Sequence, residues 1–132
     1  MAKQIEVRCA ANIAAIIVES LEWFVHTHYP HGADECSIAA REALLDLAGR
    51  FQAELVPNGS SRYSSRIRAF VCQAVKDWLA RQELDTGQCF AHRCQVVIEV
   101  CRGTSDGAGF AAAEQRDAAC TGPGLERERP FG

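Results

Sequence analysis

The sequence predicts a mainly α-helical fold, a compact bundle of three long amphipathic helices plus a fourth element. Apolar residues recur at helical spacing in three segments, at about residues 10–28, 35–55 and 60–82. Proline, glycine and asparagine separate these segments, which is typical of turns between helices. The chain has 132 residues, of which 48% are hydrophobic and 23% are charged. This length and balance indicate one globular domain of ordinary composition.

The first two predicted helices have clear boundaries. In the first, the apolar positions at helical spacing are Ile13, Ala14, Ile17, Leu21, Phe24 and Val25. Residues 29–32 include a proline and a glycine, which end this helix. Asp34 and Glu35 then place negative charge where the second helix begins, which the helix dipole favours. The turn-forming residues 57–59 end it.

The third predicted helix, at residues 60–82, is the segment around which we expect the chain to be organised. Its apolar face comprises Tyr63, Ile67, Phe70, Val71, Ala74, Val75, Trp78 and Leu79. Serines at its start can accept hydrogen bonds from the first backbone N–H groups. Arg62, Arg66 and Arg68 lie near the same end, where the helix dipole disfavours cations. This conflict marks the helix start as a candidate binding site.

Residues 88–102 fit two alternatives. A strand is favoured by the β-branched residues Val96, Val97, Ile98 and Val100. A helix is favoured by a stripe that comprises Phe90, Cys94, Val97 and Cys101. We favour a strand over 95–102 that pairs with a short strand at 3–9, because the sequence IEVRC at 5–9 resembles IEVCR at 98–102. The alternative is a fourth helix.

Glycine and proline are frequent after Gly103, and large apolar residues are few. We therefore predict a helical domain at residues 1–103 and a flexible C-terminal tail at 104–132, with a short helix at 111–119 as an alternative.

The net charge of -3 is too small to indicate a nucleic-acid-binding protein by itself. The charge is unevenly distributed, because residues 1–55 carry twice as many acidic as basic residues, whereas the charges in 62–81 are nearly all basic. Glu6 and Arg8 interrupt the start of the chain, so we expect no signal peptide. We expect a cytoplasmic protein with no membrane partner, whose seven cysteines are thiols. Its alanine- and arginine-rich composition is typical of a GC-rich bacterium.

The start of the third helix is the first candidate site. The residues that would bind an acidic partner or an anion there are Arg62, Arg66, Arg68, Ser61, Ser64 and Ser65. The alternative is that the arginines form ion pairs with acids of the neighbouring helix, such as Glu54 or Asp46.

A second candidate set could bind a metal or act in redox chemistry, and comprises Cys89, His92, Cys94 and Cys101. Its C-x4-C spacing lacks the second cysteine pair of a typical zinc site, so burial as small apolar side chains is the alternative. The sequence has no phosphate-binding glycine loop, nucleophile elbow or HExxH motif, and we predict no catalytic residues and no cofactor.

These patterns predict a small non-enzymatic interaction or regulatory protein that binds a partner protein or complex, with one version being an inhibitor encoded by a mobile element. Nucleic-acid or phosphate binding through the arginine and serine residues is one alternative, and a metal- or thiol-dependent enzyme or sensor is another. A homodimer is also predicted, because the apolar stripe of the third helix is broader than three helices would cover.

Overall fold

A computed structural model describes residues 3–29 and 35–128, with side chains up to residue 120. The elements are β1 (Gln4–Arg8), α1 (Ala11–His28), α2 (Glu35–Arg50), a π-helical segment (Phe51–Leu55), α3 (Val56–Asn58), β2 (Ser60–Ser64), a 3-10 turn (Ser65–Ile67), α4 (Arg68–Thr86), α5 (Ala91–Cys101) and α6 (Phe110–Glu128). The predicted mainly α-helical fold is confirmed. Most of the predicted turn at 29–32, and the last four residues of the predicted tail, lie outside the described residues.

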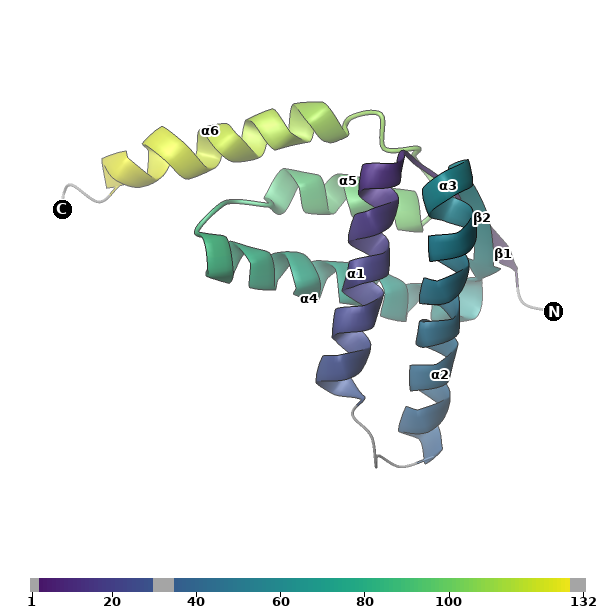
Figure 1. Cartoon of the computed structure of the whole chain (residues 1–132). Helices are drawn as coiled ribbons and strands as arrows, with labels where there is room; N and C mark the ends of the chain where they lie inside the picture. Colours follow the sequence, from purple (N-terminus) through teal and green to yellow (C-terminus); the bar gives the residue numbers. More distant parts are fainter. Residues whose placement is uncertain (1–2, 30–34, 129–132) are drawn as a thin grey trace.

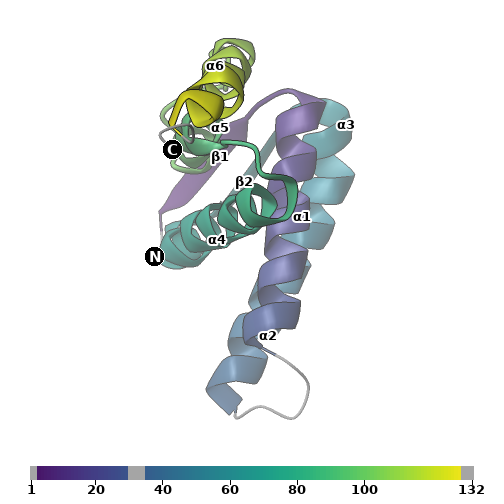
Figure 2. The ribbon, with the colours of Figure 1, turned by 90° about the vertical axis from the view of Figure 1, so that its left-hand side faces the viewer.

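The helices form two groups that cross at the core (Figure 1). α1 and α2 make an antiparallel hairpin, and α4 crosses α1. Figure 2 shows α4 and α6 nearly end-on, with α5 between them. The largest buried side chains come from both groups and include Ile13, Ile17, Leu21, Val71, Val75 and Tyr63. Burial of these apolar side chains joins the hairpin to the helix stack.

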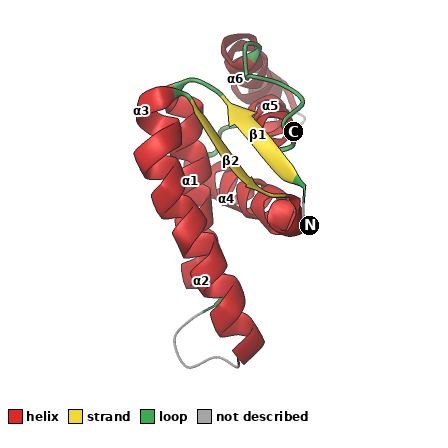
Figure 3. Cartoon of the chain, turned by 90° about the vertical axis from the view of Figure 1, so that its right-hand side faces the viewer, coloured by secondary structure: helices red, strands yellow, loops and turns green. Residues whose placement is uncertain are grey.

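A two-stranded antiparallel sheet covers the junction of the two groups (Figure 3). In its register Ile5 lies opposite Tyr63, and Glu6 lies opposite Arg62. One further backbone hydrogen bond extends the ladder at each end, from Cys9 to Gly59 and from Ser65 to Lys3. The sheet therefore ties the start of the chain to the segment before α4.

The start of the predicted third helix is wrong, because residues 60–64 form β2 and the helix begins at Arg68. Side chains in this segment alternate at the period of a strand: Ser61 and Tyr63 are buried, whereas Ser60 and Arg62 are exposed. In a helix, Ser61 and Tyr63 would not point to the same side, so they could not both be buried in this way. Pairing with β1 outweighs the helical periodicity that continues from α4.

The favoured strand at 95–102 is also wrong, and the fourth helix is the alternative that the structure confirms as α5. The strand predicted at 3–9 does form, but it pairs with β2. In α5 the buried residues are Val97, Ile98, Val100 and Cys101. Two carboxylates from other helices, Glu83 and Asp117, accept hydrogen bonds from backbone N–H groups at its start, which stabilises a helix there.

The residues after 103 begin with a loop and a helix that pack on the core. Gly107 is buried beside Ile13 and Val100. On α6, Phe110, Ala113 and Asp117 are buried against α5. The packed part of the chain thus continues into the segment that the sequence predicts as a tail, while the boundary proposed at 103 stays a prediction.

Candidate partner-binding surface

Four exposed arginines gather where β2 leads into α4. Arg62 projects from the outer face of β2, Arg66 lies in the 3-10 turn, and Arg68 is the first residue of α4. Arg50, at the end of α2, joins them by donating a hydrogen bond of 2.6 Å from Nη2 to the backbone carbonyl oxygen of Arg62. We call Arg50, Arg62, Arg66 and Arg68 the arginine surface.

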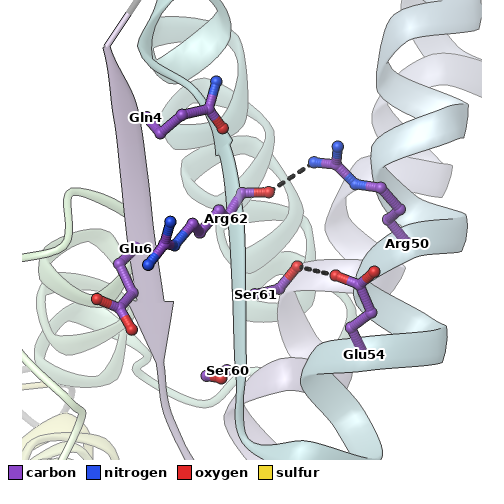
Figure 4. Close-up of a pocket in the computed structure, with 7 residues that line it drawn as sticks. All are labelled: Gln4, Glu6, Arg50, Glu54, Ser60, Ser61 and Arg62. Carbon is purple, nitrogen blue, oxygen red and sulfur yellow. Dashed lines mark hydrogen bonds between the residues drawn. The ribbon is translucent and has the colours of Figure 1, made fainter.

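A polar hollow of about 350 Å³ lies beside the arginine surface, between the sheet and the end of α2 (Figure 4). It is lined by Gln4, Glu6, Arg50, Glu54, Ser60, Ser61 and Arg62. Figure 4 shows the Arg62 side chain crossing over β1, while Arg50 approaches β2 from the opposite side. The hollow therefore presents two guanidinium groups together with the carboxylates of Glu6 and Glu54.

The predicted ion pairs with acids of the neighbouring helix do not form in the described part of the chain. Glu54 instead accepts a hydrogen bond of 2.7 Å from the hydroxyl of Ser61. Neither Glu54 nor Asp46 pairs with an arginine of this surface, and Arg62, Arg66 and Arg68 have no ion pair with any described carboxylate. Their guanidinium donors face solvent.

The three predicted serines hold the segment in shape. Ser61 is buried and bonded to Glu54. Ser64 accepts a hydrogen bond of 3.2 Å from the N–H of Arg66, which caps the 3-10 turn. The N–H of Ser65 donates to the carbonyl of Lys3. The six predicted residues thus lie in β2, the 3-10 turn and the first residue of α4, and binding by any of them stays a prediction.

The sequence reasoning missed Arg50 and Glu6. Arg50 ends α2, twelve residues before Arg62, and Glu6 reaches the hollow only because β1 pairs with β2. No sequence motif signals either residue, because Glu6 depends on the pairing of β1 with β2 and Arg50 depends on the contact of α2 with β2.

The second predicted set is divided between the core and the start of α5. Cys101 is buried and Cys94 is half-buried, and burial raises the pKa of both thiols. Cys89 and His92 lie at the other end, around the carboxylate of Asp117. Among the described residues, no three His, Cys, Asp or Glu side chains are arranged to hold a metal ion.

Asp117 holds the start of α5, where Cys89 and His92 of the second predicted set lie. Its carboxylate has no solvent exposure and accepts hydrogen bonds of 2.8 and 3.0 Å from the N–H groups of His92 and Arg93. Nε of Arg93 also donates to it at 2.9 Å, and Nδ1 of His92 lies at 2.9 Å. Burial opposes its charge, but the hydrogen bonds from Arg93 and His92 lower the pKa of Asp117 to about 2.

No helix in the described ranges has the length and apolarity needed to cross a membrane. Comparisons with protein-family models, with curated proteins and with solved structures give no match to this chain.

Proposed function

We propose that the protein is a small non-enzymatic interaction protein that binds an acidic surface of a partner protein through the arginine surface. The observation that carries this proposal is the set of three exposed arginines, Arg62, Arg66 and Arg68, whose guanidinium groups have no ion pair with a described carboxylate. A guanidinium binds a carboxylate through two parallel hydrogen bonds, so it suits an acidic protein surface.

The arginine surface is built on ordered backbone, which favours specific binding. Arg62 lies in a paired strand, and the bond from Arg50 fixes its carbonyl oxygen. Arg66 lies within a capped turn that leads directly into α4. Because little backbone freedom is lost on binding, such a surface can discriminate between partners by charge complementarity.

The hollow favours a protein partner over nucleic acid. Glu6 and Glu54 lie beside Arg50 and Arg62, and these carboxylates would repel the continuous negative charge of a phosphate backbone. A protein surface that carries charges of both signs matches this arrangement. If the bound acidic surface is the functional site of a larger complex, the chain acts as an inhibitor of that complex. One version of this proposal is an inhibitor encoded by a mobile element.

The test is to capture partners from a host lysate with the wild type and with the Arg62→Glu, Arg66→Glu double variant. Arg102→Glu with Arg116→Glu is the matched control, because it makes the same charge change at exposed positions outside the arginine surface. We expect one stoichiometric protein partner with the wild type and the control, and its loss with the double variant. Circular dichroism checks that all three chains are folded. Equal capture by all three would overturn the proposal.

A salt series with nuclease treatment distinguishes nucleic-acid binding. Binding through phosphate contacts weakens steeply as salt rises and disappears after nuclease treatment. A protein partner that survives nuclease supports the proposal, whereas recovery of nucleic acid alone contradicts it.

We also propose self-association through α4, although most of its apolar stripe is covered by α1 and α5. Phe70 and Leu84 lie near one face of α4 and are 40% and 80% exposed. Such exposed apolar side chains favour contact with another copy. Analytical ultracentrifugation of the wild type and of Leu84→Glu tests this, and a wild-type chain that sediments as a monomer at high concentration contradicts it.

A further inference from the structure

Cys89 and Cys120 lie together at the junction of α6 with the rest of the fold. Cys89 is half-buried in the loop between α4 and α5, and its Sγ lies 3.6 Å from Oδ1 of Asp117. Cys120 is exposed and follows Asp117 by three residues on α6, so the two side chains lie on the same side of that helix. The thiol of Cys120 is near enough to that of Cys89 to contribute to the raised pKa of Cys89.

The buried Asp117 keeps the loop of Cys89 beside the turn of α6 that carries Cys120. Its carboxylate binds the first N–H groups of α5 and the guanidinium of Arg93, as described above. Arg93 also donates to the carbonyl oxygen of Cys89 at 2.8 Å, which fixes the loop that carries this thiol. The network therefore fixes Cys89 against Asp117, three residues before Cys120 on α6.

We infer that Cys89 and Cys120 form a reversible disulfide bond that locks α6 onto the start of α5 when the surrounding thiol pool becomes oxidising. A disulfide needs the two sulfur atoms about 2 Å apart. Cys89 Sγ contacts Asp117, one helical turn before Cys120, so the two thiols can reach that distance by side-chain rotation, and the exposed side chain of Cys120 can rotate.

The oxidant class is a small-molecule disulfide such as glutathione disulfide, and the reaction is thiol–disulfide exchange. The Cys120 thiolate attacks one sulfur atom of the small disulfide, which forms a mixed disulfide and releases one glutathione thiolate. The Cys89 sulfur then attacks Sγ of Cys120, loses its proton to solvent, and displaces the second glutathione. The two cysteines lose two electrons in total, and the small disulfide gains them as it becomes two thiols.

The environments of the two cysteines favour this order of attack. The pKa of Cys89 is raised: the N–H of Ala91 favours its thiolate, but burial, the adjacent Cys120 and the negative charge of Asp117 outweigh that effect. Cys89 is thus mainly protonated at neutral pH and half-buried, whereas Cys120 is exposed to a small oxidant. The second step succeeds because the two sulfur atoms are neighbours, which gives Cys89 a high effective concentration.

The disulfide bond would act on a helix that has few other packing contacts. α6 packs mainly on α5, through Phe110, Ala113 and Asp117, and Figure 1 shows its later turns extending past the start of α5. A covalent bond from Cys120 to the loop before α5 would suppress the opening of this contact. The reduced protein would allow α6 to open locally. This inference does not depend on the arginine surface.

The test is to incubate the full chain with glutathione disulfide, block the remaining thiols and map the peptides without reduction. We expect a peptide that links Cys89 to Cys120, the loss of two titratable thiols, and reversal by dithiothreitol. The matched control is Cys36→Ser, which removes another exposed thiol and should form the same link. Cys120→Ser should abolish it.

Amide hydrogen exchange then measures how far the disulfide bond suppresses opening of α6. In the oxidised wild type, amides at residues 111–120 should exchange about tenfold more slowly than in the reduced protein, whereas Cys120→Ser should show no difference between the two conditions. Glutathione attached to both cysteines without the link, or a main product cross-linked between molecules, would overturn the inference. A link that leaves the exchange rates unchanged would overturn the proposed locking of α6.

Discussion

The hydroxyl of Tyr63 donates a hydrogen bond of 2.6 Å to the backbone carbonyl oxygen of Cys101. Both residues are buried, and the bond joins β2 to the last turn of α5. The last carbonyl groups of a helix lack partners within it, so this hydroxyl satisfies a group that burial would otherwise leave unpaired. Burial also raises the pKa of Tyr63 far above its usual range.

Replacing Tyr63 with phenylalanine should lower the free energy of unfolding by about 1–3 kcal/mol, since the carbonyl of Cys101 loses its buried donor. Urea unfolding followed by circular dichroism measures this change. Tyr29→Phe is the matched control, because the Tyr29 hydroxyl makes no hydrogen bond to a described residue. Equal stability of the two variants would contradict the structural role of Tyr63.

Replacing Asp117 with asparagine should destabilise the contact between α6 and α5 by about 3 kcal/mol, because the guanidinium of Arg93 would lose its buried anionic partner. Hydrogen exchange at residues 111–120 should become faster. The control is Glu114→Gln, which removes the same charge from the exposed face of α6. If Glu114→Gln had the same effect, loss of charge on α6 in general would explain the result.

Acid should weaken this contact in a defined range of pH. The pKa of Asp117 falls from 3.8 to about 2 on folding, so its carboxylate contributes stability that is complete above about pH 4. This contribution, about 2 kcal/mol, is lost as the pH falls through 2. The difference in unfolding free energy between the wild type and Asp117→Asn should therefore shrink between pH 4 and pH 2. A constant difference would rule out the ionised carboxylate as its source.

Gly107→Ala tests how tightly the loop before α6 packs. Gly107 has a φ of 82°, and a Cβ there would collide with Cδ1 of Ile13 and lie 3.3 Å from Cγ2 of Val100. We expect a loss of about 2 kcal/mol or more from strain and overpacking. Gly109→Ala is the matched control, because a Cβ there meets no atom within 4 Å, and it should cost about 0.5 kcal/mol. Equal costs would contradict the close packing of this loop.

Local periodicity predicted the parts of the fold that depend on neighbours in sequence. α1 forms almost where its apolar spacing places it. The second helix continues through the π-helical segment and α3 to Asn58 and ends at Gly59, so the turn predicted at 57–59 begins later than expected. The errors occur where contacts with residues distant in sequence determine whether a segment forms a strand or a helix. Tyr63 fits the apolar face of a helix as well as a strand, and only the pairing with β1 selects the strand. The β-branched run in α5 is helical because Asp117 and Glu83 cap it from other elements.

The candidate surface was also predictable only where it depends on residues that are neighbours in sequence. The three closely spaced arginines stand out in sequence, and Arg62, Arg66 and Arg68 do lie near one another on exposed positions. Arg50 and Glu6 join them only through tertiary contacts. The anchoring role of Asp117 likewise has no local signal, because an aspartate amid alanines on α6 resembles any exposed acidic residue until α5 is placed against it.

The pairing of β1 with β2 also constrains how the chain folds during synthesis. The first strand leaves the ribosome long before its partner, and the register joins Gln4 to Ser64. β1 must remain unpaired while α1 and α2 are made, and the helical hairpin then brings the two strand segments together. Contacts so distant in sequence slow folding. A nascent chain that stalls before residue 60 would therefore expose β1 as an unprotected edge, open to pairing with other chains.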